Sequence, residues 1–229
     1  MNATARPKVL VCDDEHQILR ALRVILRDAG FEALPASTAE EALDVAAVSH
    51  PDAAIIDLVL PDGDGIELCR RIREWSDVPL IVLSAIGDED AKVRALAAGA
   101  DDYVTKPFGP RELVARLNAN LRRIHREPED TVITSDGLEI DLARRTVRVG
   151  GEAVHLTPIE FDLLRQLATN RGRLMTHRDL LASVWGPGYA DDTQVLRAHI
   201  ANLRRKIEPP GGPRFIRTDP GVGYRFSDE

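Results

Sequence analysis

The first 123 residues alternate short apolar runs with amphipathic stretches, and this rhythm constrains the fold more than any other feature. KVLVC at 8–12 is an apolar run, and HQILRALRVILRDAG at 16–30 repeats apolar residues at helical spacing. The later pairs are EALPA with STAEEALDVAAVS, AAIID with GIELCRRIREW, PLIVLSA with EDAKVRALAAGA, and DYVTK with PRELVARLNANLRR. Five strands and five helices in strict alternation predict an α/β domain in which helices cover both faces of a parallel sheet.

Polar residues stand where four of these strands end: Asp13 and Asp14, then Asp57, Ser84 and Lys106. Sites in open parallel sheets form at the carboxyl ends of the strands, so these side chains are expected to converge there. Taken singly, each acid is better explained as a helix cap or a solvated loop residue, and Lys106 as a surface charge. The combination predicts a functional crevice.

Three carboxylates in one crevice repel one another unless a cation joins them. A compact set of oxygen ligands suits Mg²⁺, which keeps several waters and leaves room for a phosphoryl oxygen. Asp57 is then expected to attack a phosphorylated donor as a carboxylate nucleophile and to become an aspartyl phosphate. Lys106 would supply counter-charge and Ser84 a hydroxyl donor, and the bond between Lys106 and Pro107 is a candidate cis peptide.

The rhythm changes after residue 123. The segment 124–131 is polar and contains Glu127-Pro128-Glu129-Asp130, which predicts a linker. The chain is long enough for two domains that each bury a core. We therefore expect one domain at 1–123 and a second at 132–229.

The second domain carries its own structural signals. LEIDLARRTVRVGGEAVHL alternates around two turns and predicts antiparallel strands. Thr157, Pro158 and Glu160 form a capping box with proline at the first helical position, so a helix is expected to begin there. THRDLLASVWG and TQVLRAHIANLRRKIE predict two more helices, and PRFIRTDPGVGYRFS predicts a closing hairpin.

The formal net charge of −7 at first argues against a nucleic-acid partner, but the total hides a local excess. Residues 193–225 hold seven Lys and Arg against two acids, an excess of five positive charges. The helix predicted there has one apolar face, and its other side chains are expected to enter a DNA groove. The expected DNA contacts are Gln194, Arg197, His199, Asn202, Arg204 and Arg205 on the helix, with Arg217 and Thr218 on the hairpin.

The runs VLVCDDE, IIDLVLPDGDGIEL, LIVLSA and GADDYVTKPF resemble the receiver domain of two-component response regulators. The resemblance covers residues 8–123 and implies a flavodoxin-like fold. It implies Asp57 as the phosphoacceptor, with Mg²⁺ on Asp13, Asp14, Asp57 and the backbone carbonyl of Val59. It also implies Ser84 and Tyr103 as a switch pair and Lys106 as the phosphate contact.

The runs HLTPIEFDLLRQLATNRGRLMTHRDLLASVWG and IRTDPGVGYRF resemble the winged-helix effector of the OmpR/PhoB class. The resemblance implies an α+β winged helix-turn-helix domain, a sensor histidine kinase as phosphoryl donor, and promoter DNA bound by two copies. RNA polymerase is a further expected partner. VWGPGY and LRAHIANLRRKIE look most like regulators of the high-affinity potassium-transport (Kdp) operon, although Val195 replaces the aromatic residue usual in the class.

Matched charges on the face formed by the sheet edge and the helices predicted at 88–99 and 111–123 predict a two-fold interface formed on activation. Single surface pairs contribute about 0–1 kcal/mol, but an isologous interface repeats each pair. Lys92 with Glu112 and Asp102 with Arg116 are the expected pairs across the dyad; a solvated mixed-charge face is the alternative. The full expected set is Lys92, Asp101, Asp102, Glu112, Arg116 and Arg123.

Two other classes of function stay open at this point. A haloacid-dehalogenase-like phosphatase also forms an aspartyl phosphate, but it needs a second Asp two residues after the nucleophile, where Val59 stands. A DNA-binding repressor with a vestigial receiver would not need the complete polar set at the strand ends. A regulator rather than an enzyme is therefore expected.

Cellular location and redox state follow from simpler features. No apolar stretch approaches the ~20 residues of a bilayer span, and MNATARPKVL lacks the apolar core of a signal peptide. A cytosolic protein is expected. Cys12 and Cys69 lack metal-ligand spacing and lie in apolar settings, so they are expected to be reduced and structural.

Overall fold

The computed structural model describes residues 6–85, 89–124, 132–186, 189 and 192–227, without the side chains of 122–124. The chain divides into two compact units, Met1–Arg122 and Arg123–Glu229. The expected linker at 124–131 lies, apart from its first residue, outside the described residues.

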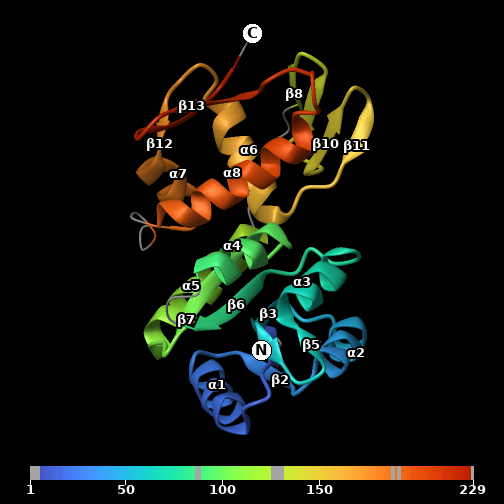
Figure 1. Cartoon of the computed structure of the whole chain (residues 1–229), viewed down its shortest axis with the longest axis vertical. Helices are drawn as coiled ribbons and strands as arrows, with labels where there is room; N and C mark the ends of the chain where they lie inside the picture. The colour runs from blue at the N-terminus through green and yellow to red at the C-terminus, as the bar shows by residue number, and fades with distance from the viewer. Residues whose placement is uncertain (1–5, 86–88, 125–131, 187–188, 190–191, 228–229) are drawn as a thin grey trace, which may run out of the picture. The chain divides into compact units, whose positions relative to one another are not determined.

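The first unit is a five-stranded parallel sheet between two layers of helices (Figure 1). Its strand order is β2-β1-β3-β6-β7, which confirms the predicted fold class. The strands are β1 (Lys8–Cys12), β2 (Glu32–Ala36), β3 (Ala53–Asp57), β6 (Leu80–Ala85) and β7 (Asp102–Lys106). The helices are α1 (His16–Asp28), α2 (Ala39–Ser49), α3 (Gly65–Arg73), α4 (Glu89–Ala97) and α5 (Pro110–Ile124).

Side-chain alternation along the strands explains why both faces are covered. Val9 and Val11 of β1 pack with Ile55 of β3 against Leu22 of α1 and Leu113 of α5. The intervening strand residues are also buried, and α2, α3 and α4 lie against the opposite face. A strand that is apolar on both sides is stable only between two helical layers, which is the arrangement observed.

A short hairpin, absent from the prediction, follows the third strand. It consists of β4 (Val59–Leu60) and β5 (Gly63–Asp64), which pair antiparallel. Two-residue strands carry no detectable periodicity, so the sequence offered no pattern for them. Helix α1 also ends at Asp28, two residues before its predicted end.

In the described residues of the second unit there are two antiparallel sheets and three α-helices, as its sequence predicted. Strands β8 (Val132–Ser135), β9 (Leu138–Asp141), β10 (Thr146–Val149) and β11 (Glu152–Val154) form one sheet. The helices are α6 (Pro158–Thr169), α7 (His177–Val184) and α8 (Thr193–Ile207). The closing hairpin of β13 (Ile216–Asp219) and β14 (Gly223–Phe226) gains a third strand, β12 (Met175–Thr176).

The predicted capping box at the start of α6 is confirmed, and it does more than begin a helix. The Thr157 hydroxyl accepts from the Glu160 N–H, and the Glu160 carboxylate accepts from the Thr157 N–H. That carboxylate also accepts a hydrogen bond from Lys206 of α8 at 2.6 Å. The buried Glu160 therefore fixes the position of α8 relative to α6.

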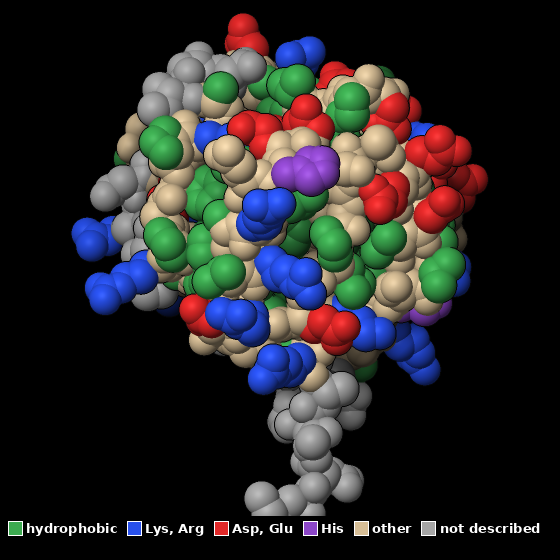
Figure 2. Space-filling view, turned by 90° about the horizontal axis from the view of Figure 1, so that it is seen from below, with side chains coloured by type: hydrophobic (Ala, Val, Ile, Leu, Met, Phe, Trp, Pro, Cys, Tyr) green, Lys and Arg blue, Asp and Glu red, His purple; other side chains and the backbone are tan. Residues whose placement is uncertain are grey.

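Exposed large apolar side chains include Val24, Val48, Val59 and Trp75. On the face drawn in Figure 2, hydrophobic side chains lie among Lys and Arg, and acidic side chains gather toward one edge. Single exposed apolar residues are normal for a folded domain. Among the described residues, no helix combines the length and apolarity needed to cross a bilayer.

Both cysteines are buried in the first unit and unpaired. Burial raises the pKa of Cys12 to about 12, and burial likewise raises the pKa of Cys69 to about 12. The Cys12 thiol donates to the carbonyl oxygen of Thr38 at 3.4 Å. Since the thiolate is the reactive form of cysteine, neither group is expected to be a nucleophile near neutral pH.

We predict that neither cysteine reacts with an aromatic disulfide reagent in native protein at pH 8, and that both react in guanidinium. Release of the coloured thiolate measures the reaction. Fast labelling of either residue in the native chain would contradict the assignment of these cysteines to the core.

Candidate functional site

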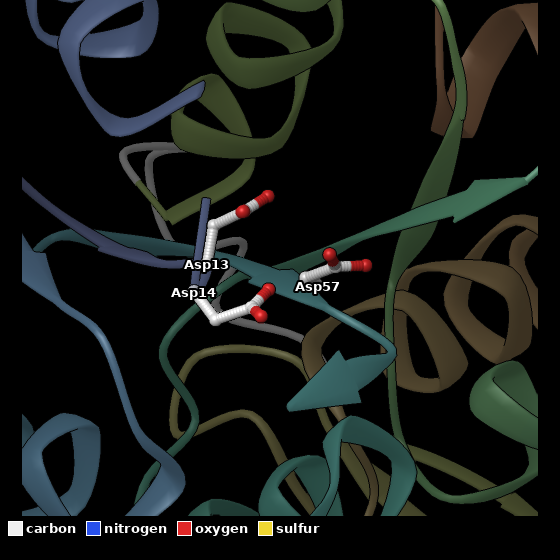
Figure 3. Close-up of side chains that lie close together, drawn as sticks. All are labelled: Asp13, Asp14 and Asp57. Carbon is white, nitrogen blue, oxygen red and sulfur yellow. The ribbon is translucent and has the colours of Figure 1, made fainter. Parts of the chain in front are cut away.

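Three carboxylates lie at the carboxyl ends of two neighbouring strands. Asp13 and Asp14 follow β1, and Asp57 ends β3, which pairs directly with β1. One ligand oxygen from each lies within 4.8 Å of the other two, and Figure 3 shows the three side chains grouped at one place. Asp13 and Asp57 are buried, whereas Asp14 is exposed. The predicted convergence of these acids is therefore observed.

Lys106 lies directly against two of these acids. Its ammonium donates to Asp57 at 2.6 Å and to Asp13 at 2.8 Å. Lys106 ends β7, and the Lys106–Pro107 bond is cis, as the sequence suggested. Residues that are far apart in the sequence thus meet because four parallel strands end at one edge.

The ionisation of the cluster reflects burial opposed by pairing. Burial raises the pKa of Asp13, although the hydrogen bonds from Lys106 and from the Glu15 N–H oppose the rise. Burial favours the neutral amine of Lys106, but its bonds to Asp13 and Asp57 outweigh this effect, so the pKa of Lys106 lies above its ordinary value. Lys106 is therefore a fixed positive charge beside Asp57.

Ser84 is buried at the end of β6, next to β7 in the sheet. Its hydroxyl has no hydrogen-bond partner among the described residues. A buried hydroxyl without a partner is costly unless a ligand uses it. Ser84 pairs in register with Thr105, one residue before Lys106, so its hydroxyl belongs to the strand ends that hold the acids.

The residues fit the ion and the group that the sequence predicted. Three carboxylate oxygens form a ligand set that Mg²⁺ prefers. Lys106 and the Ser84 hydroxyl can oppose the negative charge of a phosphoryl group on Asp57. Val59 begins β4, and its N–H lies 3.5 Å from an Asp57 oxygen, so its backbone is adjacent to the cluster.

Gly65 lies beside Asp57 and was not among the predicted site residues. A Cβ built on Gly65 would lie 2.0 Å from the carbonyl oxygen of Asp57 and 2.8 Å from Cα of Leu58. The Gly65 N–H donates to the carbonyl oxygen of Leu58 at 2.9 Å. Only glycine allows α3 to begin this close to the backbone of Asp57. The signal in the sequence was Asp64-Gly65 at the start of a predicted helix.

Tyr103, the expected switch residue, is half-buried on β7 among the charges of the expected interface. The ammonium of Lys92 lies 4.8 Å from the centre of its ring, and the Arg116 guanidinium lies 6.0 Å away. Lys92 also pairs with Glu89 at 2.8 Å, and Arg116 pairs with Glu112 at 3.1 Å. These groups therefore already have partners within one chain.

Two interface predictions need correction. Asp101 is buried and pairs with Arg73 of α3, while it also accepts the Leu80 N–H at 2.8 Å, so it faces the interior rather than a dimer partner. Asp102 is buried and accepts from Arg116 at 3.0 Å within the same chain. A carboxylate at the start of a buried strand needs an internal cation, which these arginines supply. The side chain of Arg123, also predicted there, lies outside the described residues.

The second unit presents part of the predicted DNA-binding set. Gln194, Arg197 and Arg205 are exposed on α8, and Arg217 and Thr218 are exposed on β13. Helix α8 buries Val195, Leu196, Ile200, Leu203 and Ile207, as its apolar pattern predicted.

His199 and Asn202 do not project from α8 as predicted, because both are buried. The His199 ring lies 5.5 Å from that of the buried Trp185, and the Asn202 amide oxygen accepts from Arg205 at 3.0 Å. His199 lies four residues after Val195 and Asn202 lies seven after it, and these spacings put both on the same face of the helix as Val195. The buried face of α8 is therefore wider than its apolar residues alone indicated. We withdraw both as DNA contacts.

Arg204, which was predicted as a DNA contact, makes structural hydrogen bonds within the second unit. Its guanidinium donates to the carbonyl oxygen of Ile216 at 2.6 Å and to the Thr218 hydroxyl at 2.8 Å. Glu208, one turn further along, accepts the Ile216 N–H at 2.8 Å. Arg204 and Glu208 therefore hold β13 against the end of α8.

Comparisons with known proteins agree with this two-part description. Residues 9–118 match the response regulator receiver domain, and residues 151–226 match the C-terminal domain of transcriptional regulatory proteins. Two relatives match over 221 residues, 95% of this chain and 98% of theirs. They are the transcriptional regulatory protein KdpE of Mycobacterium tuberculosis, 51% identical, and the KDP operon regulator KdpE of Escherichia coli, 48% identical.

The solved structures include a similar protein of the same two-domain length. The response regulator DrrB of Thermotoga maritima, described as an OmpR/PhoB homologue, is 33% identical. The match has a TM-score of 0.53 and covers 97% of this chain and all of that one.

We predict that Gly65→Ala lowers the free energy of unfolding by about 2 kcal/mol or more. The added Cβ would collide with the backbone of Asp57 and Leu58, so this backbone and the start of α3 must move apart. Gly63→Ala is the matched control: its Cβ would meet nothing within 4 Å, and a change within about 0.5 kcal/mol is expected. Urea unfolding measures both variants. Equal stability of Gly65→Ala and wild type would contradict the close approach.

Proposed function

The chain belongs to the OmpR/PhoB-type response regulators, which are phosphorylation-dependent regulators of transcription, and on that premise we propose specific roles for its residues. Asp57 accepts the phosphoryl group from a sensor histidine kinase. The supporting observation is the contact of Lys106 with Asp57 and Asp13 at the strand ends.

The chemistry follows from this contact. A carboxylate oxygen of Asp57 attacks the phosphorus of a phosphohistidine, an oxygen–phosphorus bond forms, and the phosphorus–nitrogen bond breaks as the imidazole leaves. Asp13, Asp14, Asp57 and the backbone carbonyl of Val59 would hold Mg²⁺, which neutralises phosphoryl oxygens when bound. Lys106 keeps its positive charge throughout and positions the nucleophile. The Ser84 hydroxyl gains the acceptor that it lacks.

Activation is proposed to exchange the partners of the charged groups near Tyr103. Ser84 bonds the phosphoryl group, and Tyr103 moves toward the space that Ser84 leaves. In a homodimer, Lys92 would pair with Glu112 of a second copy. Since this pair would replace the contact of Lys92 with Glu89 within one chain, its net stabilisation of the dimer is small.

DNA binding is proposed to use the exposed set on the second unit. Gln194, Arg197 and Arg205 would enter the major groove, and Arg217 and Thr218 would contact the backbone from the hairpin. We propose a promoter of a potassium-transport (Kdp) operon as the target, in line with the sequence resemblance and with the name of the similar Escherichia coli protein, which is a KDP operon transcriptional regulatory protein. On this proposal the protein acts in the cytoplasm, and RNA polymerase is a further proposed partner.

We predict that Asp57→Ala abolishes incorporation of phosphoryl label from acetyl phosphate in magnesium buffer. The variant should also lose the increase in dimer fraction and promoter affinity that acetyl phosphate produces. Sedimentation and fluorescence anisotropy of the full chain measure these changes. Asp44→Ala is the control, because Asp44 is exposed on α2, away from the strand ends.

Two outcomes would reject this assignment. One is label incorporation into Asp57→Ala at the wild-type level. The other is a wild-type chain that takes up label without any change in promoter affinity, which would favour a receiver that is not coupled to DNA binding.

For the DNA surface, we predict that Arg197→Ala weakens specific promoter binding by about 1–3 kcal/mol, as expected for loss of one arginine contact to a base pair. Arg144→Ala is the control, because Arg144 is also exposed but pairs with Asp141 in the sheet of β8–β11. Anisotropy at fixed salt measures both. An equal loss in the two variants would indicate a general charge effect instead.

A further inference from the structure

The start of helix α2 is held by a residue from another part of the chain. The first N–H groups of a helix lack partners within the helix. Thr38 accepts the Glu41 N–H at 3.1 Å, as an N-cap residue normally does. The Ala39 and Glu40 N–H groups instead donate to the two carboxylate oxygens of Asp62, at 2.8 and 3.0 Å. These bonds hold the pKa of the Asp62 carboxyl below its usual value.

Asp62 lies at the turn of the small hairpin that follows the phosphoacceptor. Val59 pairs with Asp64, and Leu60 pairs with Gly63, so Asp62 stands at the tip. The hairpin begins two residues after Asp57, and its first residue is Val59. The tip that docks on α2 and the backbone beside the acids are thus parts of one hairpin of six residues, 59–64.

The other side of this contact is fixed to the acids as well. The Asp13 N–H donates to the carbonyl oxygen of Ala36, in the segment before α2, at 3.2 Å. The thiol of Cys12 donates to the carbonyl oxygen of Thr38. The start of α2 is therefore anchored to the end of β1, which carries Asp13 and Asp14.

We propose that Asp62 is a positioning residue for the metal site: by docking the 59–64 hairpin on α2, it holds the Val59 carbonyl in place beside the carboxylates of Asp13 and Asp57. The inference rests on the proposed function of these residues. Asp62 touches neither phosphoryl group nor metal. It acts by reducing the number of conformations open to the hairpin, so that ion binding does not have to order it.

Removing Asp62 should lower Mg²⁺ affinity by about fivefold. Only a fraction of the molecules would then have the hairpin in the conformation that binds the ion. Loss of a nearby negative charge would also weaken binding, and the two causes must be separated. Asp62→Asn removes the charge but keeps one carbonyl oxygen for a backbone N–H. Glu40→Gln removes a neighbouring exposed charge whose side chain is not the acceptor of these bonds.

The test titrates the full unphosphorylated chain with magnesium chloride by calorimetry and follows amide exchange at residues 39 and 40 by NMR. We expect fivefold weaker binding and faster exchange in Asp62→Ala, an intermediate affinity in Asp62→Asn, and wild-type affinity in Glu40→Gln. Asp52→Ala should also match wild type. Asp52 accepts the Lys8 N–H at the amino end of β1, whereas the acids lie at the carboxyl end, so it reports general loss of stability.

Three results would overturn the proposal: Asp62→Ala binding Mg²⁺ as tightly as wild type, Asp62→Asn as weak as Asp62→Ala, or Asp52→Ala equally weakened. The proposed function fails in a different way, by absence of label from acetyl phosphate in the wild type. Because the titration needs no phosphorylation, the two failures are distinguishable.

Discussion

The arrangement of the first unit depends on the contact between Lys106 and two buried aspartates. A buried carboxylate is tolerated only where a cation or a set of donors compensates it. Lys106 meets this need for Asp57 and Asp13 at one time, from a strand two places away from β3 in the sheet. The order of the parallel strands brings these ends together, and no local segment of the chain could do so.

The second unit also compensates buried carboxylates with cations and backbone donors, but there the carboxylates hold elements together rather than form a reactive site. Glu160 and Glu208 are both buried, and each joins a backbone N–H to a basic side chain. Glu160 thereby connects α6 to α8, and Glu208 connects α8 to the hairpin. The exposed arginines of α8 are presented on a helix whose carboxyl end is held in position by these internal carboxylates.

The sequence predicted the features that repeat or that have specific chemistry. Alternation gave the parallel sheet, and the polar residues at the strand ends marked the acidic site. The errors concern residues whose neighbours come from elsewhere in the fold. Asp101 is charged and looked like a surface residue, but Arg73 of a distant helix compensates it inside. His199 is polar, yet Trp185 covers it. Asp62 caps a helix that begins 23 positions before it, and helix-capping patterns in a sequence are local.

The adjacent acids at the start of β7 have a consequence for the edge of the sheet. Successive residues of a strand point to opposite faces, so Asp101 reaches Arg73 of α3, and Asp102 reaches Arg116 of α5. A slip of β7 by one residue along β6 would turn each carboxylate toward the wrong layer and leave two unpaired charges in the interior. An outermost strand has only one neighbouring strand to align it. The register of β7 is thus held by these two ion pairs as well as by packing.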